Sequence, residues 1–363
     1  MRAHHQLQHV NDLEGRGPCP FGSALGAFSA ALSIGVFIVP ADLLGGLYIY
    51  VANNRVHTKS LGVDGRKRVI SDMGQGEAYE KISSTAKLVA HIRSFTDIPF
   101  TKEIAAASGA EKDFQTLTGK SAEFMTQSAF NLEARYKTTD QIIARYRITQ
   151  VLEIAAGLSP RGLAMTDDPN VVYVATDLPE ILEQEKAIAE SILAKSNIHR
   201  SNLYYRIANA LDRESLLQAA IPFRSDKPVA IITEGLLPYL TRDEKETLAG
   251  NIRDLLKQHD GIWITPDVST KQLWKFISQA DDTMQQRMQN ISGATGRNIE
   301  TNTFEDENAV RQFFTSAGFT IEEYSYSNVL EDLSSVKLSK FKREEIFEIL
   351  QMQKTLILTI RSS

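Results

Sequence analysis

Cysteine is almost absent from this chain of 363 residues, and the shortage removes several kinds of site. Cys19 is the only cysteine. The chain therefore forms no internal disulfide, and it builds neither a zinc site with several cysteine ligands nor a CxxC redox pair. This composition fits a reducing compartment. We expect a cytoplasmic protein without a bound metal.

An excess of positive charge is also missing. The chain has 40 Lys and Arg against 45 Asp and Glu, a formal net charge of −5, which argues against nucleic acid as the main partner. Hydrophobic residues make up 42% of the chain and charged residues 23%, so extensive disorder is not expected. The length suits one large α/β domain with additions or two smaller domains.

Charged residues are missing from one segment near the N-terminus. None occurs from Ala24 to Ala41, and the apolar character resumes after Asp42. A run of this length can cross a bilayer, which would give a membrane anchor with the remainder of the chain in the cytoplasm. The run also fits a disordered extension, or an upstream stretch outside the true reading frame. We therefore divide the chain into an apolar and basic extension, residues 1–72, and one domain, residues 73–363.

Helical and strand-like patterns alternate through the larger part of the chain. Apolar residues recur at helical spacing in three segments, 85–95, 140–146 and 181–196. Seven strand-like runs occur, at 150–155, 170–178, 203–211, 228–237, 261–268, 319–326 and 355–361. Because helical patterns separate the first five runs, we expect an α/β fold with a mostly parallel sheet and helices on both faces. The last two runs lie close together, so one of them is expected to be an antiparallel edge strand.

The turn after the first strand lacks the features of two common nucleotide sites. Gly157 and Gly162 have the glycine spacing of a Walker A loop, but Leu163 and Ala164 follow where lysine and a hydroxyl residue are required. A dinucleotide turn needs a second close glycine for the pyrophosphate, and Pro160 has no N–H to donate. The turn can still bring backbone close to a ligand that has no pyrophosphate.

An acid ends the second strand-like run. A carboxylate at Asp177 can accept hydrogen bonds from both hydroxyls of a ribose, which is the arrangement expected for S-adenosylmethionine. An acid in this place is as often a turn or helix-capping residue. Asp177 by itself leaves both interpretations open, and Gly157 by itself fits an ordinary turn glycine.

Six segments between about Ile82 and about Val268 carry a more specific signal. In chain order they are ISSTAKLVAHIRSF, EARYKTTDQIIA, VLEIAAGLSPRG, ATDLPE, IANALD and ITEGLLPYL. Together they resemble the leucine carboxyl methyltransferase-like family of S-adenosylmethionine-dependent O-methyltransferases. The resemblance implies a Rossmann-like class I methyltransferase fold with a seven-stranded sheet and added cap helices over residues 73–363. It also implies a methyltransferase enzyme with S-adenosyl-L-methionine as its cofactor.

The resemblance assigns roles at the methionine and ribose ends of the cofactor. Arg135 would pair with the methionine carboxylate, a task suited to a guanidinium fork. Ala155 and Gly157 would form the turn of close approach, and Asp177 would bind the ribose. Glu234 would face the methionine amino group, because a buried strand-end glutamate with no cation nearby would be costly.

Further roles concern the adenine and the acceptor. Asn209 and Ala210 would lie beside the adenine, and Tyr239 is as suited to the core as to contact with substrate. The chain departs from the family pattern at Ala155, at Ser159, where an aspartate is usual, and at Asn209. An alanine can serve in the turn if its φ is negative, and an asparagine can still accept from the adenine amino group.

The acceptor is expected to be a small-molecule or polyketide-like acid. Methyl transfer to an ionised carboxylate needs alignment and exclusion of water, whereas a hydroxyl acceptor needs a base, for which His91, His199 and His259 are candidates. Residues 271–293, expected to roof the site, contain no motif that names a substrate. A non-catalytic protein that keeps the cofactor fold remains an alternative, as does a hydroxyl-directed O-methyltransferase.

Overall fold

A computed structural model describes four stretches of the chain, residues 86–112, 129–268, 270–272 and 297–361. The expected extension over residues 1–72, with its apolar run, lies outside the described residues, as does most of the segment 271–293. In the part that is described, no helix combines the length and the apolar character needed to cross a bilayer.

Seven strands form one sheet in the order β3-β2-β1-β4-β5-β7-β6. They are β1 (Gln150–Ile154), β2 (Val172–Asp177), β3 (Leu203–Ile207), β4 (Val229–Thr233), β5 (Gly261–Thr265), β6 (Phe319–Ser325) and β7 (Lys354–Ile360). The pairs among β1 to β5 are all parallel, and β7 runs antiparallel to both of its neighbours. The mostly parallel seven-stranded sheet expected from the sequence is confirmed.

The antiparallel strand is not at the edge, which corrects one expectation. β7 lies between β5 and β6, and β6 is the edge strand, parallel to β1 to β5. The reason lies in the two sequences: Thr355 to Leu358 are buried, whereas β6 carries Glu322 and Glu323, which an edge position tolerates.

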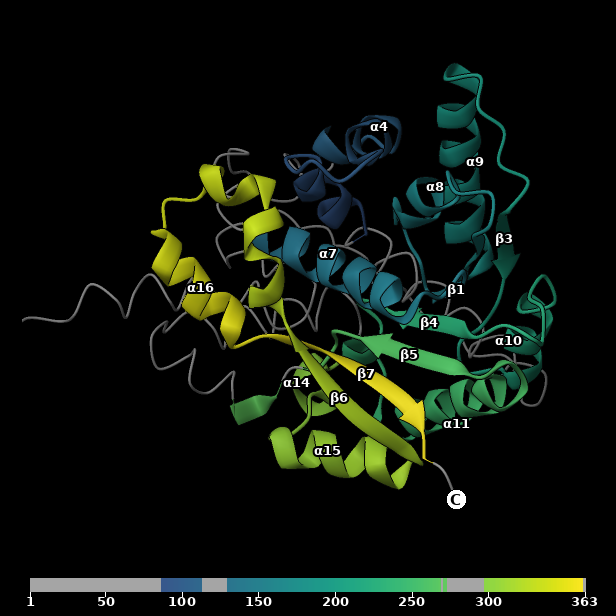
Figure 1. The fold of residues 1–363 in the computed structure, drawn as a ribbon, viewed down its shortest axis with the longest axis vertical. Helices are drawn as coiled ribbons and strands as arrows, with labels where there is room; N and C mark the ends of the chain where they lie inside the picture. The colour runs from purple at the N-terminus through teal and green to yellow at the C-terminus, as the bar shows by residue number, and fades with distance from the viewer. Residues whose placement is uncertain (1–85, 113–128, 269, 273–296, 362–363) are drawn as a thin grey trace, which may run out of the picture.

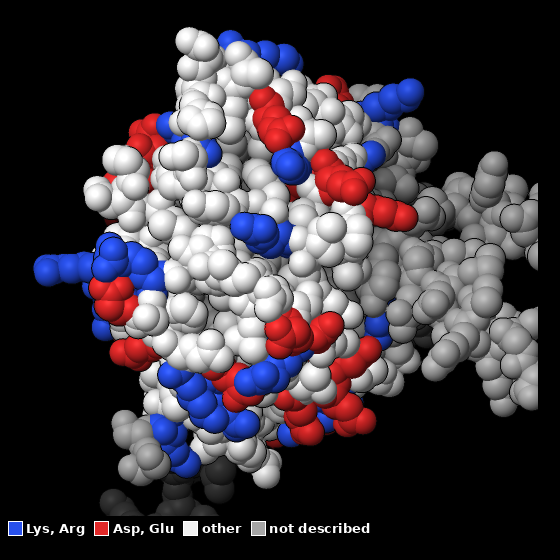
Figure 2. Space-filling view, turned by 90° about the vertical axis from the view of Figure 1, so that its right-hand side faces the viewer, with Lys and Arg blue, Asp and Glu red and all other residues white. Residues whose placement is uncertain are grey.

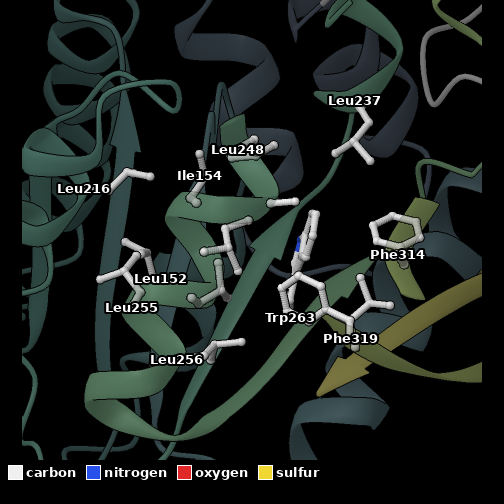
Figure 3. Close-up of a cluster of buried hydrophobic side chains, with 14 of the residues drawn as sticks. Leu152, Ile154, Leu216, Leu237, Leu248, Leu255, Leu256, Trp263, Phe314 and Phe319 are labelled. Atoms are coloured by element: carbon white, nitrogen blue, oxygen red, sulfur yellow. The ribbon is translucent and has the colours of Figure 1, made fainter. Parts of the chain in front are cut away.

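Helices cover both faces of the sheet (Figure 1). On one face, α7 (Ala129–Tyr146) packs through Ile142 and Ile143 against Val151 of β1. On the other face, α10 (Arg213–Ala219), α11 (Arg242–His259) and α15 (Glu307–Ser316) enclose the largest cluster of apolar side chains, centred on the fully buried Trp263 (Figure 3). Because successive side chains of a strand point to opposite faces of the sheet, the domain has one apolar core on each face.

The remaining elements connect or cap these layers. Residues 86–93 are helical, and the others are α4 (Thr101–Ala107), α8 (Arg161–Met165), α9 (Pro179–Lys195), η2 (Leu237–Tyr239), α14 (Ile299–Asn302), η3 (Tyr326–Asp332), η4 (Ser334–Leu338) and α16 (Arg343–Gln351). The side of the molecule that carries β3, α9 and α10 has acidic and basic side chains interspersed around a largely uncharged centre (Figure 2).

A capping box fixes the start of α11 and thereby the short segment after β4. Thr241 Oγ1 accepts from the Glu244 N–H at 3.3 Å, and Glu244 Oε2 accepts from the Thr241 N–H at 2.8 Å. This reciprocal pair satisfies two backbone donors at the N-terminus of the helix. The capping box thus fixes where the segment between β4 and α11 ends, and this segment contains Tyr239.

Candidate active site

A cavity of about 160 Å³ lies at the carboxyl ends of the parallel strands. Its walls come from the segments that follow β1, β2, β3 and β4, together with α7 and the helical residues 86–93. Every residue assigned from the family resemblance lines this one cavity: Arg135, Ala155, Gly157, Asp177, Asn209, Ala210, Glu234 and Tyr239. The departing residue Ser159 lines it too. The structure thus brings together residues that are up to about a hundred positions apart in the chain, while their roles remain predictions.

The turn after β1 has two residues in the left-handed region. Gly157 has φ +61°, and Ala155 has φ +57°. The condition stated for an alanine in this turn, a negative φ, is therefore not met. A residue with a Cβ loses roughly 1–2 kcal/mol in this conformation, a cost that a glycine at the same position avoids. The turn therefore keeps its left-handed conformation at Ala155, at this cost in free energy.

Asp177 is buried and bonded to backbone. Its Oδ2 accepts from the Gly157 N–H at 2.9 Å, and its Oδ1 accepts from the Leu178 N–H at 2.8 Å. Burial raises the pKa of Asp177 to about 6, although both N–H groups favour the ionised form. Each oxygen keeps an acceptor position, so the carboxylate can still receive a ligand hydroxyl.

Glu234 is surrounded by cations. Its Oε1 accepts from Arg135 Nε at 3.0 Å and from Arg93, and its Oε2 accepts from Arg161 Nη2 at 3.0 Å. The sequence argument that this carboxylate has no cation nearby is therefore wrong. Burial alone would raise the pKa of Glu234, but the three guanidinium groups outweigh it and hold the pKa below its ordinary value.

Arg161 is the centre of this charged cluster, and sequence reasoning missed it. Its side chain is 0% exposed. Besides Glu234, it contacts Asp140 of α7 through Nε at 2.8 Å and Glu153 of β1 through Nη1 at 2.6 Å. The guanidinium also lies 4.3 Å from the centre of the Tyr136 ring. Three carboxylates outweigh burial and raise the pKa of Arg161 above its ordinary value.

A signal for this cluster was present in the sequence. Glu153 stands within the apolar strand β1, all of whose residues are buried. A charge inside such a strand predicts a buried cation, because an unpaired carboxylate there is very costly. Glu153 also accepts from the Tyr173 hydroxyl on the neighbouring strand. Asp140 and Arg161 lie in two of the segments that carry the family resemblance, so the same motifs supplied both partners.

Two guanidinium nitrogens at the cavity have no acceptor among the described residues. They are Arg135 Nη1 and Arg93 Nε, on side chains that are buried and line the cavity. A buried donor without an acceptor costs about 1–3 kcal/mol. Guanidinium donors beside the acid Glu234 are groups of the kind that bind the carboxylate and ammonium of an amino acid, so the residues present fit the methionine end of S-adenosylmethionine.

The segment after β3 forms the opposite end of the cavity. Asn209 is exposed, and its side-chain oxygen accepts from the Leu211 N–H at 2.9 Å, which leaves one acceptor position. The carbonyl of Ala210 accepts from Asn251 Nδ2 at 3.1 Å. Apolar side chains of Leu178 and Ile181 line the same end. This polarity suits the flat, weakly polar adenine.

A second buried acid, also missed from the sequence, shapes the loop after β4. Asp267, beyond β5, accepts from the backbone N–H groups of Gly235, Leu236 and Leu237 at 2.8, 2.7 and 3.2 Å. Burial raises the pKa of Asp267 to about 6, although those N–H groups oppose the shift. The contacts hold the loop that leads from Glu234 to Tyr239.

The three candidate base histidines do not line the cavity in the part of the chain that the structure describes. His91 is buried against Phe95, and burial lowers its pKa. His259 packs against Phe223 at the end of α11, and His199 is exposed. A hydroxyl-directed mechanism would need a base from elsewhere.

Comparison with known proteins finds a family to which part of the chain is similar. The family model for leucine carboxyl methyltransferase matches residues 86–253. A proposed S-adenosyl-L-methionine-dependent methyltransferase of Mycobacterium ulcerans is 33% identical over 111 residues, 30% of this chain and 34% of that protein. A second, from Mycobacterium marinum, is 26% identical over 205 residues, 52% of this chain and 67% of that protein. Over the matched residues the chain is therefore similar to the family that the motifs indicate, and the match spans about a third of the length of the first of these relatives.

Solved structures to which this chain is similar are distant in sequence. A proposed methyltransferase from Thermobifida fusca is 15% identical with a TM-score of 0.44, over 75% of this chain and 94% of that one. The magnesium protoporphyrin IX methyltransferase from Synechocystis, solved with S-adenosylhomocysteine bound, is 12% identical with a TM-score of 0.39, over 70% of this chain and 100% of that one.

Proposed function

We propose, from the premise that residues 86–253 belong to the leucine carboxyl methyltransferase family, that the whole chain is an S-adenosylmethionine-dependent O-methyltransferase whose acceptor is a carboxylate of a small molecule. The convergence of the eight predicted residues on one cavity at the carboxyl ends of the strands carries the proposal. Ligands of open α/β sheets bind at this edge.

We assign each group of the cofactor to a partner in the cavity. Asp177 accepts from the ribose hydroxyls, and the Ala155–Gly157 turn passes close to the ligand. Asn209 and Ala210 lie beside the adenine. This orientation directs the methionine end toward the charged cluster around Glu234, where opposite charges are available.

The methionine end meets complementary charges. Arg135 Nη1, which has no acceptor among the described residues, donates to the methionine carboxylate. Glu234 uses three of its roughly four acceptor positions on arginines. The fourth, on Oε2, accepts from the methionine ammonium. Glu234 thus binds the ligand and supports Arg135.

The acceptor is proposed to be an acid because no proton then has to be removed. When bound, S-adenosylmethionine supplies a methyl group on a sulfonium, and an acceptor carboxylate oxygen forms the new C–O bond as the C–S bond breaks. The chain's part is to align the two partners and exclude water. Tyr239 and Arg297 also line the cavity, and the charge of Arg297 is balanced by Glu244 at 3.0 Å.

Transfer of a radiolabelled methyl group to matched acids and alcohols tests the proposal. Each pair shares one carbon skeleton and differs only in carboxylate against hydroxyl. We expect label in the acids as esters that alkali hydrolyses. Label in the alcohols alone would assign a hydroxyl-directed enzyme. Tight cofactor binding without transfer to any acceptor would favour a non-catalytic binding protein.

A further inference from the structure

We infer that Arg161 is a positioning residue for the cofactor: it fixes the carboxylate of Glu234 and thereby directs Arg135 toward the methionine carboxylate. The inference rests on the proposed function. Arg161 does not line the cavity, so it acts through Glu234 and not by touching the ligand.

The position of the Arg161 guanidinium is determined from three sides. Each of its three nitrogens donates to a carboxylate on a different element, Asp140 on α7, Glu153 on β1 and Glu234 after β4. The Tyr136 ring covers the group at 4.3 Å. A lysine ammonium has neither the planar fork nor the reach to keep these three contacts together.

The two carboxylate oxygens of Glu234 bind different arginines. Oε2 faces Arg161, while Oε1 faces Arg135 and Arg93. Arg135 donates from its Nε to Oε1, at 3.0 Å, and its buried Nη1 has no acceptor among the described residues. If Arg161 no longer held Oε2, the carboxylate could turn and bond both nitrogens of the Arg135 fork. Arg135 would then have lost the donor that the ligand needs.

The cluster around Arg161 is also balanced in formal charge. Arg93, Arg135 and Arg161 balance Asp140, Glu153 and Glu234 before any ligand binds. The amino-acid end of the ligand carries one carboxylate and one ammonium, so its binding keeps this balance. Arg161→Lys keeps the balance as well, so that variant tests the geometry of the guanidinium fork and not its charge.

Calorimetric titration of the full chain with two ligands tests the inference. S-adenosylhomocysteine has the amino-acid end, and 5′-methylthioadenosine has the same adenosine and thioether without it. For Arg161→Lys, we expect S-adenosylhomocysteine to bind at least tenfold more weakly, and 5′-methylthioadenosine to change less than twofold. Arg213→Lys, which alters an exposed pair with Asp254, is the matched control and should change neither.

The possible results of these titrations separate a failure of the positioning role from a failure of the proposed function. An equal loss for both ligands, or no loss for either, would overturn the positioning role. If Arg161→Lys does not fold, Asp140→Asn tests the inference instead. This substitution at a partly exposed acid removes one of the three carboxylates that hold Arg161, and we expect the affinity for S-adenosylhomocysteine alone to fall about threefold. If the parent chain binds neither ligand, the proposed function itself fails, and this inference with it.

Discussion

Two acids at the carboxyl ends of parallel strands face the same cavity, and their surroundings are opposite in kind. Asp177 at the end of β2 is held by two backbone N–H groups, and burial raises its pKa to about 6. Glu234 after β4 is held by three guanidinium groups, which keep its pKa below the ordinary value. Neutral donors leave a buried carboxylate able to titrate near neutrality, whereas cations fix it in the charged form. We propose that the first suits ribose hydroxyls and the second the charged methionine end.

Removing the charge of Glu234 should have the largest effect. Glu234→Gln leaves the guanidinium groups of Arg93 and Arg135 without a counter-charge in a buried site, and we expect a loss of about 3–5 kcal/mol in the free energy of unfolding. Urea denaturation measures it. Glu246→Gln, in an exposed pair with Arg242, is the control and should cost less than about 1 kcal/mol. A loss at Glu234 as small as in the control would show that the cluster is not a charged unit.

The corresponding change at the other acid should affect binding more than folding. Asp177→Ala removes the acceptor of the ribose hydroxyls, and we expect S-adenosylhomocysteine to bind more weakly by about 1–3 kcal/mol. Its destabilisation should be smaller than that of Glu234→Gln, since no buried charge is left unpaired. Calorimetry and denaturation together separate the two effects, with the exposed Asp226→Ala as the control. Unchanged affinity in a folded Asp177→Ala protein would refute the ribose assignment.

The difference in pKa predicts how binding changes with pH. Asp177 is ionised above about pH 6 and protonated below it, and the protonated form is the poorer acceptor. The affinity for S-adenosylhomocysteine should therefore be constant from pH 8 to 7 and fall as the pH drops through 6, approaching about tenfold per pH unit well below it. Glu234 stays charged throughout this range. Asp140 and Asp267 have similar pKa values, so the profile of Asp177→Asn assigns the step. A step that persists in this variant would not belong to Asp177.

The smallest effect is expected in the turn beside Asp177. Ala155→Gly relieves the left-handed strain, offset in part by the greater freedom of glycine in the unfolded chain, and should stabilise the fold by up to about 1 kcal/mol. Ala156→Gly, at a neighbouring residue whose φ is not positive, should instead destabilise it by about 0.5–1 kcal/mol. Thermal melting compares the two. Equal destabilisation would mean that Ala155 is not strained.

The sequence predicted the strands and the strand-end acids, because apolar runs and their ends are local features. It did not predict the partners of Glu234, since Arg161 is 73 and Arg93 141 positions away, and only the fold brings them together. Arg135, which the family motifs indicated, lines the cavity, while its role stays a prediction. The motifs gave no indication that Glu234 already held Arg135. The sequence did not predict the positive φ at Ala155, because an alanine is ordinarily right-handed or extended and only the folded turn shows the exception.

A structure of the chain with S-adenosylhomocysteine bound tests the central claim most directly. The account predicts the ribose hydroxyls on the Asp177 carboxylate and the homocysteine carboxylate on Arg135 Nη1, with Glu234 still bonded to Arg161 through Oε2. A ligand in the reverse orientation, with its adenosine at Glu234, or one bound outside the cavity, would contradict it.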